Sequence, residues 1–307
     1  MTQISTSPGM PPIPAPDMAD AAGPQSTANP SRRALMRTLG SWPVLLSLLV
    51  LAALVLAAVG APLLTATDPT AIDPAQRLRP VSPQHWLGTD AYGRDIYSRV
   101  LHGARVSLLV GLGVAAFSLV AGLLIGVLAG YFRWVDAIVM RVMDGLMAIP
   151  GILLAIALVS ISGSSLLTVL AAITIPEVPR VVRLVRGVIL GVRNEPYVEA
   201  ALTLGTPLPT LMLRHLVPNT MAPLIVQCTY IFASAILTEA ILSFLGAGVP
   251  PEVSSWGNIM AEGRAYFQLL PGLVLYPGLL LSLTVLGVNL LGDALRDVLD
   301  PRMARRA

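Results

Sequence analysis

The sequence predicts an all-α, polytopic membrane protein with six transmembrane helices, and two properties of the chain carry this prediction. Of its 307 residues, 55% are hydrophobic and only 12% are charged, and the mean hydropathy is +0.75. A soluble domain carries roughly 25% charged residues, so this chain lacks the polar groups that would cover a water-facing surface. Its long uncharged runs reach the roughly 20 residues that a membrane-spanning helix needs. A soluble globule and a largely disordered chain are therefore both excluded.

The chain divides into four parts by composition. Residues 1–34 are rich in Pro, Ser, Ala and Gly and are expected to form a disordered cytoplasmic tail. Residues 35–104 hold the first transmembrane helix, within the uncharged run 42–64, and an external loop. Residues 105–295 form the core transmembrane domain, and residues 296–307 form a cytoplasmic C-terminal tail.

Five further spans are expected in the core. The uncharged run 145–176 is too long for one crossing at about 1.5 Å per residue, and the Ser-Gly-Ser-Ser stretch at 162–165 divides it. The spans are expected near 106–130, 139–161, 165–187, 216–238 and 265–292. Pro150 and Pro176 can kink their spans, although simple packing irregularity is the other interpretation. In the second span, Gly122, Gly126 and Gly130 share one helix face and predict close packing against a neighbouring helix.

The distribution of arginine predicts the orientation. All 20 basic residues are Arg, and with the N-terminus in the cytoplasm the assignment places fourteen of them in cytoplasmic segments and six outside. Cytoplasmic segments of membrane proteins carry the excess of positive charge. Both termini are therefore expected in the cytoplasm.

Cysteine, histidine and charge patterns exclude other classes of protein. Cys228 is the only cysteine, so an intrachain disulfide framework is excluded, and the three histidines lie too far apart in sequence to suggest a metal site. The chain also has no compact basic stripe of the kind that binds nucleic acid.

A polar segment at 194–219 is not explained by membrane insertion. Asn194 is a good helix cap, Pro196 suits a first helical turn, and Gly205 suits a helix end. We expect a short helix over 197–204 and a second one ending at Pro218, which together make a helix-turn-helix lever outside the bilayer. An ordinary connecting loop is the alternative.

This segment resembles the EAA loop of ABC importer permeases. Glu199, Ala200, Ala201 and Gly205 match the start of that loop's pattern, and Pro218 matches its end. His215 and Val217 stand where the pattern has Ile and Leu. The resemblance implies that this segment docks on a cytoplasmic ATPase subunit, with these coupling residues: Glu199, Ala200, Ala201, Gly205, His215 and Pro218.

Three further segments are similar to the C-type permease subunit of dipeptide, oligopeptide and nickel ABC importers. They are Leu-Gly-Thr-Asp-Ala-Tyr-Gly-Arg-Asp at 87–95, the pair 243–248 and 255–258, and the pair 289–297 and 300–302. The resemblance covers roughly residues 35–302 and implies the type I importer fold in a bacterial inner membrane. It implies four kinds of neighbour: a second homologous permease, two ABC ATPases, an extracytoplasmic substrate-binding protein and membrane lipid.

The chain is not expected to be an enzyme. A nucleotide-binding phosphate loop needs a lysine, and the sequence contains none. We therefore expect no cofactor on this chain, with ATP and Mg²⁺ bound by the partner ATPase subunits.

Polar residues near the spans supply further candidates. Gln227, Tyr230 and Glu239 on the fifth span are candidates for the translocation path, with helix–helix contacts as the alternative. Arg141 is expected to pair with Asp144 three residues later.

The external segments supply candidates for docking the binding protein. Residues 94–105 predict a short amphipathic helix at the membrane surface. Arg94, Glu252 and Trp256 are expected to contact a substrate-binding protein.

The function indicated is that of a permease for dipeptides or oligopeptides. A permease for nickel or another small solute is the alternative within the family. An ion-coupled secondary transporter is the rival class, although no repeat relates residues 40–160 to 165–292. A structural membrane anchor is a third interpretation.

Overall fold

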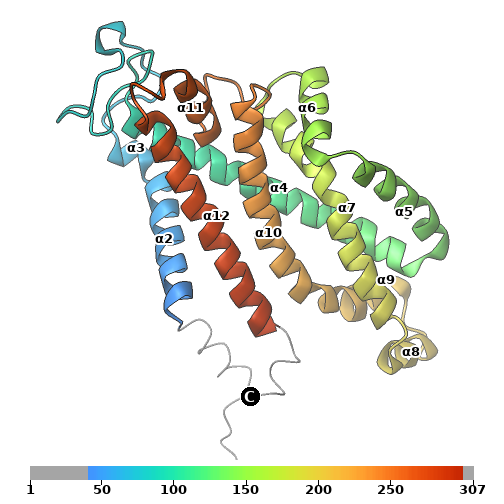
Figure 1. The fold of residues 1–307 in the computed structure, drawn as a ribbon. Coiled ribbons are helices and arrows are strands. Elements are labelled where there is room, and N and C mark those ends of the chain that lie inside the picture. Colours follow the sequence, from blue (N-terminus) through green and yellow to red (C-terminus); the bar gives the residue numbers. More distant parts are fainter. Residues whose placement is uncertain (1–40, 300–307) are drawn as a thin grey trace, which may run out of the picture.

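A computed structural model describes residues 41–299, which fold into helices joined by loops, with no β-strand in this range (Figure 1). This confirms the predicted all-α class. The predicted tail 1–34 and residues 300–307 of the C-terminal tail lie outside the described residues. The helices are α2 (Trp42–Val59), α3 (Ala61–Leu64), α4 (Ile96–Tyr131), α5 (Arg133–Ala148), α6 (Gly151–Ser162), α7 (Leu166–Val192), α8 (Pro196–Thr203), α9 (Leu208–Leu211), α10 (Val217–Phe244), α11 (Trp256–Gly263) and α12 (Gly272–Leu299). Short 3₁₀ turns lie at Pro74–Gln76 and Arg264–Tyr266, and a π turn lies at Met212–Leu216.

The number of spans is compatible with the six that the sequence predicts. Four helical stretches are long and apolar enough to cross a membrane: α2, α4, the stretch Leu208–Phe244 that includes α9 and α10, and α12. The bent pair α5 and α6 makes a fifth if it counts as one span. Helix α7, with 27 residues, is long enough to be a sixth span, but it contains too many charged residues to count among the apolar stretches.

The spans lie side by side with α4 crossing behind them (Figure 1). Helix α2 packs on α12, α12 packs on α10, and α10 packs on α7. Helix α4 packs on both α7 and α10. The loop 65–95 and α11 lie at one end of this bundle, which we call the α11 end. At the opposite end, called the α8 end, lie α8, the start of α2 and the end of α12.

The glycine stripe on α4 contacts α7, as predicted. A Cβ atom on Gly126 would lie 2.7 Å from Cβ of Val185, and one on Gly130 would lie 2.7 Å from Cβ of Ile189. Real carbon atoms do not approach so closely, so the stripe lets the two helix backbones come together. This packing fixes the position of α7 against α4.

The predicted surface helix at 94–105 is wrong, because residues 96–105 are the start of the long helix α4. Asp95 caps α4, its Oδ2 accepting from the backbone N–H of Ser98 at 2.8 Å. The helix then continues for 36 residues without a break. Ile96 and Val100 are buried against Ile259 of α11, so the apolar face meets protein where the prediction had lipid.

The third span is also not the single helix expected at 139–161. It divides into α5 and α6, which meet at 90° across Ile149 and Pro150. Proline lacks the backbone N–H that a helix needs and disfavours the helical conformation in the preceding residue. The kink interpretation of Pro150 is therefore confirmed.

Candidate functional site

The short helix α8 matches the lever predicted from the sequence. It runs Pro196–Thr203 and ends at Gly205, whose φ is +77°. The backbone N–H of Gly205 donates to the carbonyl of Leu202, and that of Thr206 donates to the carbonyl of Ala201 at 3.1 Å. This pair of bonds is the glycine-dependent helix end known as a Schellman motif. Gly205 is required here because a side chain strains the backbone at positive φ.

One face of α8 is anchored and the other is exposed. Val198 is fully buried and Ala201 nearly so, and both belong to the core cluster that includes residues of α4 and α7. Glu199, Ala200 and Leu204 are exposed, with Leu204 at 86%. The helix therefore presents an accessible surface while its inner face follows the spans.

A polar and aromatic contact links α8 to the start of α10. The ring of Tyr197 stacks on the ring of His215 with centroids 6.4 Å apart. Asn219 Nδ2 donates to Tyr197 Oη at 3.1 Å and to the carbonyl of His215 at 2.6 Å. Nδ1 of His215 is buried and has no partner among residues 41–299. These contacts connect α8 to the π turn and to the start of α10.

The expected second short helix ending at Pro218 is wrong. Instead, α9, the π turn Met212–Leu216 and α10 form one stretch from Leu208 to Phe244. Pro218 lies in the first turn of α10, where its missing N–H is tolerated. The wider π turn before it takes up the irregularity in the hydrogen-bond ladder.

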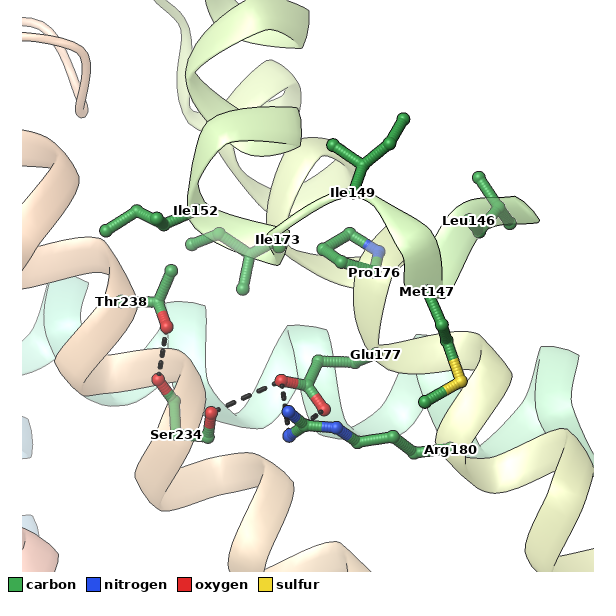
Figure 2. A pocket seen from close by; sticks show the side chains of 11 residues that line it. Leu146, Met147, Ile149, Ile152, Ile173, Pro176, Glu177, Arg180, Ser234 and Thr238 are labelled. Atoms are coloured by element: carbon green, nitrogen blue, oxygen red, sulfur yellow. Dashed lines mark hydrogen bonds and ion pairs between the residues drawn. The ribbon is translucent and has the colours of Figure 1, made fainter. Parts of the chain in front are cut away.

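A second feature is a cavity between α7, α10 and the α5–α6 break. Its volume is about 230 Å³, and its walls include Ile149, Ile152, Ile173 and Pro176. Figure 2 shows Glu177 and Arg180 of α7 facing Ser234 of α10 across it. The cavity combines an apolar wall with a small number of charged and polar groups, which is the usual make-up of a ligand site.

The polar groups of this cavity form a short chain of bonds. Arg180 Nη1 donates to both carboxylate oxygens of Glu177, each at 3.2 Å, and Ser234 Oγ donates to Glu177 Oε1 at 3.2 Å (Figure 2). Thr238 Oγ1 donates to the carbonyl of Ser234 at 2.7 Å. The Glu177 side chain is only 10% exposed, whereas that of Arg180 is 57% exposed.

This cluster lies at mid-depth in the bundle. At 1.5 Å per residue, Glu177 is about 16 Å along the axis from Leu166, and Ser234 is about 15 Å from Phe244. The hydrocarbon core of a bilayer is about 30 Å thick. The count of arginines placed Arg180 among the fourteen of the cytoplasmic segments, whereas here it lies near the middle of α7.

Two more arginines of α7 pair with α5. Arg183 Nη2 lies 2.6 Å from Asp144 Oδ1, and Arg186 Nη2 lies 2.7 Å from Asp136 Oδ2. The predicted pairing of Asp144 with Arg141 is therefore wrong. Arg141, three residues before Asp144 on the same helix, competes with cations of neighbouring helices for this carboxylate. Here Arg183 of α7 supplies the nearer cation.

The three path candidates from the sequence lie outside this cavity. Gln227 and Tyr230 are half-buried on α10, and Tyr230 Oη donates to Asp293 Oδ1 of α12 at 2.6 Å. Glu239 is fully buried. Its Oε1 accepts from Ser243 Oγ at 2.8 Å and its Oε2 from Ser107 Oγ at 3.4 Å. Glu239 thus joins α10 to α4, which fits the helix-contact interpretation and not a lining role.

Two of the three docking candidates are also buried. Trp256 is fully buried, and its Nε1 donates to the carbonyl of Val100 at 3.1 Å. Arg94 is 8% exposed and its guanidinium contacts carboxylates of the same chain. Their predicted direct contact with a binding protein does not fit this burial. Glu252 is exposed in the loop before α11 and stays a docking candidate.

Arg94 belongs to a buried cluster of four charges at the α11 end. Its Nε lies 2.7 Å from Asp90 Oδ2, and its Nη2 contacts Glu262 of α11. Arg99 Nη1 contacts the same Asp90 oxygen and lies 2.7 Å from Glu262 Oε2. The two positive and two negative charges cancel, so the cluster has no net charge. Its ion pairs connect loop 87–95 to α4 and α11.

Sequence reasoning missed the cavity cluster. Glu177, Arg180, Ser234 and Thr238 were not among the site residues predicted from the sequence. Two charges beside Pro176, at the end of a 32-residue uncharged run, were the available signal. Ionisable groups inside a membrane are functional candidates by default. Among residues 41–299 no cluster of His, Cys, Asp and Glu is arranged to hold a metal ion.

Comparison with known proteins identifies a family and several relatives of this chain. Residues 122–305, which contain the cavity and α8, match the family described as the inner membrane component of binding-protein-dependent transport systems. The chain is 54% identical over 251 residues to a probable peptide ABC transporter permease protein of Sinorhizobium fredii, covering 82% of this chain and 86% of the relative.

Two other relatives extend the comparison. A dipeptide transport system permease protein of Alkalihalophilus pseudofirmus is 40% identical over 279 residues, which cover 91% of this chain and 92% of the relative. A glutathione transport system permease protein of Pectobacterium atrosepticum is 43% identical over 223 residues, which cover 72% of this chain and 74% of the relative.

Proposed function

The chain belongs to the family of inner membrane components of binding-protein-dependent transport systems, and we propose that it is the permease subunit through which an ATP-driven importer moves peptides. Relatives named for peptide, dipeptide and glutathione transport support peptides as the cargo. A nickel or other small-solute permease, the alternative within the resemblance, has no support among these names. The chain itself carries out no hydrolysis in this proposal.

The observation that carries the proposal is the link from α8 to α10. In the complex, α8 rests on a cytoplasmic ATPase subunit through its exposed residues. Movement of that subunit is passed by Tyr197 to His215 and Asn219, and so to α10. Because α10 also carries Ser234, the same movement reaches the cavity at mid-depth. Opening of this region toward one side and then the other would transport the cargo.

The partners and orientation follow from this assignment. Two ATPase subunits and a second permease of the same family complete the transporter, and an extracytoplasmic binding protein delivers the peptide at the α11 end. The α8 end faces the cytoplasm of a bacterium with both chain termini. The excess of arginine in the segments assigned to this side supports that orientation.

The coupling is tested with a matched pair of glycine variants. Gly205→Val places a β-branched residue at positive φ, whereas Gly191→Val changes a helical glycine with nothing within 4 Å. Both variants are purified in the whole transporter, and peptide uptake and ATPase co-purification are measured. We expect Gly205→Val to insert normally but to lose uptake, and Gly191→Val to retain it.

The opposite result would remove the coupling role from α8. If Gly205→Val supports uptake at the wild-type rate, then the shape of this helix end does not matter for transport. If the purified wild-type chain brings no ATPase with it, the rival ion-coupled transporter becomes the better interpretation.

A further inference from the structure

Arg180 is held at one side of its guanidinium and is open at the other. Only Nη1 is bonded to Glu177, and in the described range 41–299 the Nε and Nη2 groups have no hydrogen-bond partner. The side chain is 57% exposed and borders the cavity. Arginine presents its donors as a planar fork that matches a carboxylate. A positioned cation with unused donors therefore faces an open space.

The other two arginines of α7 differ from Arg180 in where their partners lie. Arg183 and Arg186 each reach across to an acid on α5, so their charges are used to hold two helices together. Glu177, in contrast, lies one turn from Arg180 on the same helix, so this pair joins no helices. Ser234 donates to Glu177 as well and fixes the carboxylate. Glu177 and Ser234 thus orient Arg180 without closing it off.

Depth and shape limit what binds there. The site lies about 16 Å from the start of α7, near the middle of a bilayer, where an unused charge is costly. Its volume of about 230 Å³ equals that of about eight waters in the liquid. This suits one anionic group with a single side chain against the apolar wall, not a whole oligopeptide. The first residues of α6, Gly151 and Ile152, also line the cavity, and the N-terminus of a helix favours negative charge.

We propose that this cavity binds the C-terminal carboxylate of a translocating peptide, with Arg180 as the direct ligand and Glu177 as a positioning residue. The proposal rests on peptides being the cargo. The terminal carboxylate is common to peptides of different length and sequence, so one fixed cation suits a mixed set of cargoes. Peptide side chains need no fixed partner, and the Ile-rich wall accepts apolar ones.

The test compares three tripeptides in proteoliposomes that contain the whole transporter and saturating binding protein. They are Ala-Ala-Ala with a free carboxylate, the same peptide as its C-terminal amide, and amidated Ala-Asp-Ala, whose only carboxylate is in a side chain. We expect Arg180→Gln to slow uptake of the free acid about tenfold or more and to leave uptake of the amidated trialanine unchanged. Arg180→Lys should recover part of the loss, and Glu177→Gln should lower free-acid uptake less than Arg180→Gln.

Two controls separate this proposal from folding and from the proposed function. Arg183→Gln, one turn away, should affect all three peptides equally. Co-purified ATPase shows whether a variant still assembles.

If Arg180→Gln slows uptake of the free acid and of the amide equally, or slows neither, the carboxylate assignment is overturned while peptide transport stands. A loss confined to the aspartate peptide would overturn the assignment to the C-terminus. If the wild-type transporter moves none of these peptides, the proposed function fails and this inference fails with it.

Discussion

The chain builds two clusters from the same residue types, one closed and one open. At the α11 end, Arg94 and Arg99 share Asp90 and Glu262, and the Arg99 side chain is only 1% exposed. At mid-depth, Arg180 has a single carboxylate partner and more than half of its side chain is exposed. In the closed cluster every charged side chain contacts at least one opposite charge, and Nε of Arg99 is its one fully buried side-chain nitrogen or oxygen without a partner in the described residues. Completeness of pairing, not the presence of charge, therefore distinguishes the structural cluster from the proposed binding site.

The largest effect should come from breaking the closed cluster. Arg99→Gln leaves Asp90 and Glu262 with too little positive charge in a buried place, which costs about 3–5 kcal/mol. We expect a large drop in the melting temperature of the purified chain. Arg77→Gln is the control, because Arg77 is exposed and, within residues 41–299, its guanidinium donates only to Tyr266 Oη at 3.2 Å. Equal melting temperatures for the two variants would show that the closed cluster has no structural role.

A smaller effect is expected where α7 packs on α4. Gly122→Ala places a carbon against Cβ and Cγ1 of Val181, and overpacking of this kind costs about 1–3 kcal/mol. Because α7 carries Glu177 and Arg180, its displacement should also lower transport of every peptide alike. Gly145→Ala has open space around it and gains up to about 1 kcal/mol of helix propensity. The melting temperatures of the two variants test this prediction. Equal stability of Gly122→Ala and Gly145→Ala would contradict the close packing of α7 on α4.

The smallest effect is expected at an exposed interhelical pair. Arg183→Gln removes the contact with Asp144, whose side chain is 58% exposed, as is 42% of the arginine. Exposed pairs contribute about 0–1 kcal/mol because water and salt screen them. The melting temperature should therefore change little. A loss as large as that of Arg99→Gln would place this pair with the closed cluster and weaken the comparison.

Much of the fold could be predicted from local sequence signals. The apolar runs predict most of the spans, Gly205 predicts the end of α8, and the stripe ending at Gly130 predicts that α4 packs closely on a neighbouring helix. Each of these signals needs only a few neighbouring residues to be read. The domain boundaries proposed from composition rest on the same kind of signal and stay a prediction.

Long-range pairing could not be predicted in this way. Asp144 is paired across 39 positions, and Arg94 meets Glu262 across 168. Sequence periodicity shows that a face is polar but not which residue covers it, so Arg94 and Trp256 were expected at the surface. The cavity was missed for the same reason, because Arg180 and Ser234 come together only through the packing of α7 on α10.

The central claim is that the open cluster lies on the peptide path, and thiol labelling tests it most directly. In the whole transporter with Cys228→Ser, Thr238→Cys lies at the cavity, whereas Leu237→Cys is 43% exposed on the same helix and lies outside the cavity lining. We predict that a membrane-impermeant anionic thiol reagent labels position 238 but not position 237 during ATP turnover. We also predict that peptide with a free carboxylate protects position 238 better than its amide does. Equal labelling of both positions, or none at 238 in any nucleotide state, would contradict the account.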